Sequence, residues 1–110
     1  MSADLKAENE VVLREMADRG DDLSKVRVVE FTAAFADKLS ALAFTEQVEA
    51  MGYKVDVEEN GTVASLPWDA IAAREMVPTL NAITDAEIRL GDVAHSLGGE
   101  MDGWGCLRPD

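Results

Sequence analysis

The sequence has 110 residues, of which 47% are hydrophobic, so it is long enough for one domain with a core of its own and too apolar for a disordered acidic tail. It carries 22 acidic and 10 basic residues, a formal net charge of −12. Nucleic acids and anionic membrane surfaces attract positively charged proteins, so this charge argues against both as partners. It favours a basic protein surface, or a partner that is not recognised through electrostatics at all.

The first predicted element is a helix from about Asp4 to Arg19, a segment without Gly or Pro. Its apolar residues fall on one stripe at helical spacing: Leu5, Val12, Leu13 and Met16. Gly20 follows and suits a helix C-terminus. The next segment, Lys25–Thr32, is rich in β-branched and aromatic residues, which favours a strand.

From Asp37 to Met51 the apolar residues return to helical spacing, and the charged residues between them can face solvent. Gly52 ends this second predicted helix. The segment Tyr53–Glu58 alternates apolar and charged residues, which predicts a strand that is buried on one face and solvated on the other.

The segment Trp68–Val77, between Pro67 and Pro78, is compatible with two structures. Its alanines favour a helix by propensity, but its large apolar residues form no helical stripe, so a strand suits it equally well. The residues alone leave both alternatives open.

Thr84 and Glu87 have the spacing of a capping box, which predicts that a third helix begins at this point. Gly98 and Gly99 end that helix, whose apolar stripe is formed by Ala86, Leu90, Val93 and Leu97. The last segment, Glu100–Leu107, is short and predicts a closing strand.

After the first helix, the order of predicted elements is strand, helix, strand, strand, helix, strand, if Trp68–Val77 is a strand. This order predicts an α+β fold of the split β-α-β-β-α-β type, with a four-stranded antiparallel sheet and two helices on one of its faces. We expect a single domain over residues 1–110, with the N-terminal helix and turn in 1–22 and the core in 23–107.

No residues of the sequence form a recognisable catalytic or metal site. His95 is the only histidine, and no sequence signal pairs it with Cys106 or with a serine. Cys106 is the only cysteine, which excludes an internal disulfide, and no Lys, Arg or His beside it would activate its thiol. The pairs of carboxylates lack the spacing of a calcium loop. We therefore expect no enzymatic activity, no metal and no cofactor.

The location of the protein is inferred from two absences and from the single cysteine. The residues after Met1 show no basic region followed by an apolar one, and no apolar run is long enough to span a bilayer. A single thiol is typical of a protein in a reducing compartment. We therefore expect a cytoplasmic protein.

The string Asp102-Gly103-Trp104-Gly105 is unusual, because two glycines flank a tryptophan in a predicted strand. In a structural interpretation, the glycines allow Trp104 to pack closely. In a functional interpretation, Trp104 is a rigid aromatic anchor for a partner. We favour the structural interpretation and expect Trp104 to be at least partly buried.

The same string, preceded by Gly98 and Gly99, resembles the GG-x-x-DGWG motif of the regulator of ribonuclease activity B (RraB) family. Three further stretches resemble that family in the same order along the chain. They are Leu13–Asp22, the first helix and its exit; Arg27–Phe31, the first strand; and Met51–Val55, a helix-to-strand junction. The resemblance runs from about Leu13 to Cys106.

The resemblance implies a ferredoxin-like sandwich preceded by an extra N-terminal helix, and it favours a strand at Trp68–Val77. It marks Asp102, Gly103, Trp104 and Gly105 as the family motif and as candidate interaction residues. It also implies a non-catalytic regulator that binds the scaffold region of ribonuclease E, or another basic surface, through protein–protein contacts. The best-known member differs in carrying a long acidic C-terminal tail after the motif.

A small-molecule-binding module with an unknown ligand is the alternative function. An antiparallel sheet with one wet face can hold a ligand, and a fold by itself does not determine a function. A hydrolase is a third hypothesis, against which the lack of any acid–base pair argues.

Overall fold

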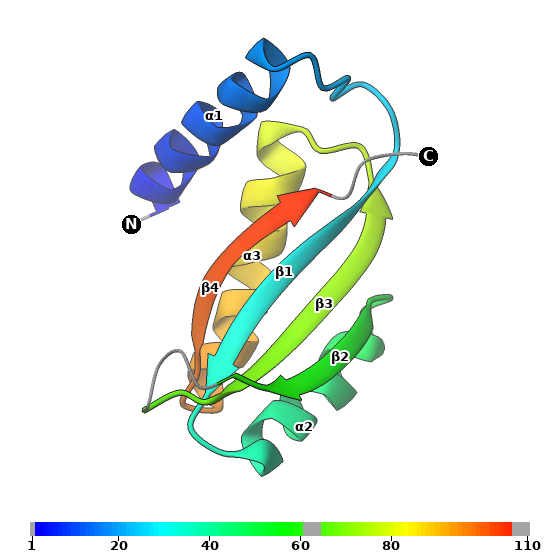
Figure 1. Cartoon of the computed structure of the whole chain (residues 1–110). Coiled ribbons are helices and arrows are strands. Elements are labelled where there is room, and N and C mark those ends of the chain that lie inside the picture. The colour runs from blue at the N-terminus through cyan, green and yellow to red at the C-terminus, as the bar shows by residue number, and fades with distance from the viewer. Residues whose placement is uncertain (1, 61–64, 107–110) are drawn as a thin grey trace.

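A computed structural model describes residues 2–60 and 65–106 of the chain, with side chains from residue 5 onward. Figure 1 shows how its elements are arranged. In chain order they are α1 (Ser2–Asp18), β1 (Arg27–Phe35), α2 (Lys38–Glu49), β2 (Lys54–Glu59), β3 (Trp68–Met76), α3 (Leu80–Ser96) and β4 (Glu100–Cys106).

The four strands form one antiparallel sheet in the order β2-β3-β1-β4. The helices α2 and α3 lie together on one face of this sheet, and in Figure 1 the sheet stands in front of them. This arrangement confirms the predicted α+β fold, with its ferredoxin-like sheet and its extra N-terminal helix.

The core lies between the sheet and α2 and α3, and β1 is its centre. Alternate residues of β1 are completely buried and point toward the helices: Val29, Phe31, Ala33 and Phe35. Phe35 packs against Phe44 of α2, with ring centroids 5.2 Å apart. Ile83 and Leu90 bring α3 onto the same cluster. The intervening residues of β1 therefore face away from both helices.

The helix α1 lies outside this sandwich, alongside α3 and beyond the edge strand β4 (Figure 1). Its buried residues Leu13, Met16 and Asn9 anchor it. Asn9 lies four residues after Leu5 and four before Leu13. Val12, which the sequence places on the apolar stripe, is instead 38% exposed. Gly20 follows the helix at a φ of +93°, as its predicted role at the C-terminus requires.

The segment between the two prolines is a strand, which decides the alternative left open by its residues. β3 pairs with β1 on one side and with β2 on the other. Its Ala70 and Ala72 are completely buried beneath the helices, whereas Ile71 and Ala73 lie on the other face. Pairing on both edges outweighs the weak helical propensity of the alanines.

The predicted start of the third helix is wrong, because the helix begins more than one turn before Thr84. α3 begins at Leu80, and the N-cap is Thr79, whose side-chain oxygen accepts a hydrogen bond from the Ala82 N–H at 3.1 Å. Thr84 and Glu87 form no capping box; both are buried inside the helix and face α1. The Thr-x-x-Glu pattern matched residues that serve tertiary packing instead.

The other predicted boundaries are within a few residues of the observed ones. Asp37 caps α2 by accepting a hydrogen bond from the Ser40 N–H at 2.8 Å. β4 ends at Cys106, and Leu107, the predicted end of the closing strand, lies outside the described residues. Among the described residues, no helix is long and apolar enough to cross a membrane.

Candidate functional site

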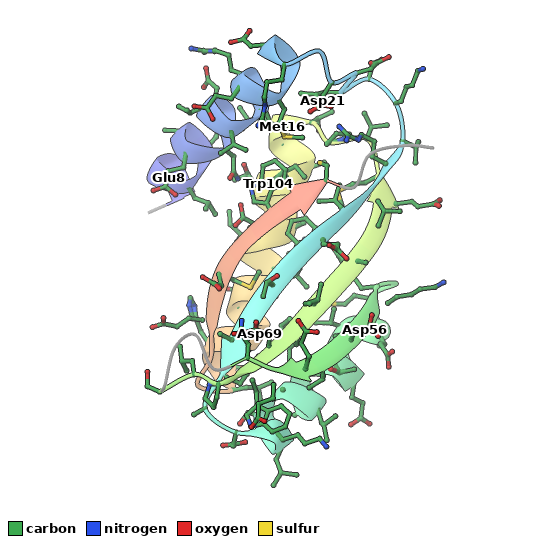
Figure 2. The ribbon with its side chains drawn as sticks, in the orientation of Figure 1. Glu8, Met16, Asp21, Asp56, Asp69 and Trp104 are labelled. Atoms are coloured by element: carbon green, nitrogen blue, oxygen red, sulfur yellow. The ribbon has the colours of Figure 1, made fainter. Side chains whose placement is uncertain are left out.

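Trp104, the centre of the unusual string, lies on β4 opposite Phe31 of β1 and points to the helix side of the sheet. It is partly buried, as expected, and packs against the core. Figure 2 shows it between the end of β4 and α1. It lines a hollow of about 330 Å³ together with Met16 and Arg27.

The indole nitrogen of Trp104 is tied to α1. Its N–H donates a hydrogen bond to Asn9 Oδ1 at 2.9 Å. Asn9 in turn donates through Nδ2 to Thr84 Oγ1 at 3.2 Å and to Glu87 Oε1 at 2.8 Å. One buried amide thus joins α1, α3 and β4, which are distant in sequence.

Asn9 is a buried contact residue that the sequence pattern did not single out. Asn9 is only 3% exposed, and it interrupts the apolar stripe of α1 four residues after Leu5 and four before Leu13. A polar residue at such a position must find partners when it is buried. That interruption is the signal that could have identified Asn9 as a buried polar contact.

Glu87 is the buried carboxylate of this cluster. Its burial raises the pKa of the carboxyl, the hydrogen bond from Asn9 lowers it, and the negative charge of Glu8 raises it further. Burial is the largest of these effects, so the pKa of Glu87 lies above its ordinary value of 4.5.

The two glycines beside Trp104 differ in their roles. Gly103 has a φ of +103° and lies where β4 gains one residue relative to β1, so it permits a bulge in the strand. The expectation that both glycines permit close packing is wrong, because a Cβ at Gly103 or Gly105 would meet nothing within 4 Å. The close approach is at Gly99, where a Cβ would lie 2.5 Å from the Phe35 ring.

The sheet face that is opposite α2 and α3, which we call the open face, is strongly acidic. It follows from the strand register that Glu30 of β1, Asp69 and Glu75 of β3, and Asp56 and Glu58 of β2 all lie on it. Glu100 of β4, opposite Ala34, lies there too. Among the paired strand residues that the structure describes, Lys54 is the one basic residue on this face.

Most of these carboxylates reach solvent. Asp56, Glu58, Glu75 and Glu100 are exposed and Glu30 is half-buried, whereas Asp69 is buried and accepts a hydrogen bond from Asn60 Nδ2 at 2.8 Å. Figure 2 shows Asp56 and Asp69 on the side of the sheet that is turned away from α3. No helix of the described residues covers this face (Figure 1). The open face is therefore an acidic surface across all four strands.

The two residues considered for catalysis lie on separate elements. His95 is exposed in the last turn of α3, and Cys106 is half-buried at the end of β4. Burial is the largest influence on the pKa of the Cys106 thiol and raises it, which disfavours the reactive thiolate. Within residues 2–60 and 65–106, no group of three His, Cys, Asp or Glu side chains could hold a metal ion.

Comparison with known proteins gave one family. The family model RraB, described as regulator of ribonuclease activity B, matches residues 6–106. This span reaches from α1 to the end of β4 and includes both the Asn9 contacts and the open face. The search of curated proteins found no match.

Proposed function

The chain belongs to the RraB family, whose members regulate ribonuclease activity, and we propose that it does so by binding a basic segment of a ribonuclease rather than by catalysis. The segment that we propose is the scaffold region of a ribonuclease E-type enzyme. Scaffold segments that hold RNA are basic because they must neutralise phosphates. A regulator of this kind needs a complementary surface and no reaction centre.

The single observation that carries this proposal is the acidic open face. Its solvent-reaching carboxylates (Glu30, Asp56, Glu58, Glu75 and Glu100) lie on all four strands of one sheet. Arg side chains can pair with such carboxylates as they pair with phosphates, in a bidentate manner. An acidic face of this kind would also speed the association with a basic partner by electrostatic steering.

We assign the residues of the DGWG string a positioning role in this function. Trp104 points to the side of the sheet opposite the open face and is engaged by Asn9. Asp102 and Gly103 belong to the bulge that shapes β4, and Gly105 pairs with Glu30. The motif therefore holds β4 and α1 in place, and the partner contacts the carboxylates.

The proposal is tested by the kinetics of binding to the immobilised scaffold region of the host ribonuclease E. The double variant Asp56→Asn, Glu58→Gln removes two open-face charges, and Glu46→Gln, Glu49→Gln removes two exposed charges from α2 as a matched control. We expect the open-face variant to associate about threefold or more slowly than the control variant, because charges near the contact dominate steering. We also expect the wild-type rate to fall about tenfold between low and high salt.

Two results would contradict this proposal. Absence of binding at moderate salt would remove the ribonuclease scaffold as the partner. Equal losses in the two double variants would show that total charge, and not the open face, governs the association.

A further inference from the structure

A groove on the helix side of the molecule is not used by the proposed function. It runs between α1, α3 and β4 and encloses a volume of about 380 Å³. Its walls are Leu5 of α1, Ile88 of α3 and Met101 of β4, and Gly91 lies at its floor. The volume is in the lower part of the range of small-molecule sites, which is about 300–1,000 Å³.

Packing does not require a glycine at the floor of the groove. Gly91 lies in the middle of α3, where glycine is a poor helix former compared with alanine. A Cβ at this position would lie 3.5 Å from Met101 Cγ, an ordinary van der Waals contact, and φ is not positive. Neither the backbone nor the neighbours require glycine, and its effect is to leave the groove open.

The polar groups of the groove are mainly acidic. Glu87 is 6% exposed and lines the groove while one of its oxygens accepts the hydrogen bond from Asn9. Asp92 lines the same groove and is exposed, and His95 lies one turn further along α3. Glu8 is close enough to act on the charge of Glu87. A buried carboxylate beside apolar walls favours a ligand with a positive charge next to an apolar body.

We propose that this groove binds a small organic cation of the alkylammonium or arylalkylammonium class. The apolar body lies against Leu5, Ile88 and Met101, and the ammonium group lies at Glu87 and Asp92. An anionic ligand would be repelled by these carboxylates, and a neutral ligand would leave their charge unpaired. The groove and the open face are on opposite sides of the sheet, so a ligand in the groove would not cover the open face.

The test uses the full chain without any ribonuclease and 4-phenylbutylammonium as the probe. The methyl resonance of Met101 is followed by NMR during a titration, with 4-phenylbutanol as a neutral probe of similar shape. We expect saturable binding in the millimolar range or tighter, and affinity for the ammonium about fivefold or more above that for the alcohol. Glu87→Gln, which keeps the acceptor for Asn9, should weaken ammonium binding about tenfold.

Gly91→Leu fills the floor of the groove and should abolish the shift, whereas Gly91→Ala should keep it. Thermal unfolding confirms that both variants are folded, and Glu46→Gln on α2 controls for binding to acidic residues elsewhere. Equal affinity for the ammonium and the alcohol, or no saturable shift of Met101, would overturn the proposal. Dimerisation of the free chain that produces the same shift would overturn it too, because a second copy would then be the occupant.

Discussion

Substitution of Trp104 tests whether the DGWG string stabilises the fold. Trp104→Ala empties part of the core and leaves Asn9 Oδ1 without its donor. Because the ring is only partly buried, we expect a loss of about 2–4 kcal/mol in the free energy of unfolding, somewhat below the range for fully buried aromatic residues. Trp104→Phe keeps most of the ring but removes the N–H, and should cost about 1 kcal/mol.

Chemical denaturation of the three proteins measures both losses. An unchanged unfolding free energy in Trp104→Ala, together with loss of binding to the ribonuclease scaffold, would show instead that Trp104 is an exposed anchor. That result would contradict the positioning role.

Glu87 makes stability depend on pH in a direction that can be checked. Burial raises the pKa of this carboxyl in the folded state, so its charged form destabilises the fold at any pH above that raised pKa. The cost disappears as the pH falls through the raised value, where the folded protein takes up a proton before the unfolded chain does. We expect Glu87→Gln to melt at a higher temperature than the wild type at pH 7, with the difference vanishing near pH 4.

Glu46→Gln, on the exposed side of α2, is the control for simply removing one negative charge from an acidic protein. A difference between Glu87→Gln and the wild type that is the same at pH 7 and pH 4, or the same as for Glu46→Gln, would refute the effect of burial.

At the scale of elements, the packing of the junction between α3 and β4 against β1 depends on Gly99. A Cβ there would lie 2.5 Å from two atoms of the Phe35 ring and 2.7 Å from the backbone oxygen of Ala34. Since the backbone cannot yield as a side-chain tip can, we expect Gly99→Ala to lower the unfolding free energy by about 2 kcal/mol or more. Gly105→Ala, with open space around its Cβ, should change it by less than about 0.5 kcal/mol.

Thermal melts of the two alanine variants make this comparison directly. Equal stability of Gly99→Ala and Gly105→Ala would mean that the junction between α3 and β4 adjusts without cost, against the contact geometry.

The elements themselves were largely predictable because hydrophobic period and turn residues act locally. Asp37, Gly20 and the alternation in β2 marked boundaries that the structure shows within a few residues. Thr84 misled the prediction because a Thr-x-x-Glu pattern is the same whether it caps a helix or faces another one. β3 was ambiguous because its pairing with β1 and β2 is a long-range property.

The candidate site was less predictable than the elements. The DGWG string could be recognised, but the hydrogen bonds of Trp104 to Asn9 and of Asn9 to Glu87 join residues far apart in the sequence. The roles of Gly99 and Gly105 could not be separated without knowing that Phe35 lies against one of them. Such contacts follow from tertiary packing, which local patterns do not contain.

At the scale of the whole molecule, the distribution of charge over the surface determines which face can contact a basic partner, and the total charge does not. The net charge of −12 is evident from composition, but it does not tell which face carries it. Strand register places Asp56 and Glu58 beside Ile71 and Asp69, and a shift of one residue would turn them to the helix side. The acidic open face is therefore a product of the fold.

We propose that the open face is the surface that a basic ribonuclease segment contacts. Titration of the isotope-labelled chain with the scaffold region of the ribonuclease, followed by NMR chemical-shift mapping, tests it most directly. We predict that the largest shifts occur on β1, β2 and β3 at residues that include Glu30, Asp56 and Glu58, and that α1 and the groove beside Met101 change little. Shifts confined to α1, α3 or Trp104, with the open face unchanged, would contradict the account.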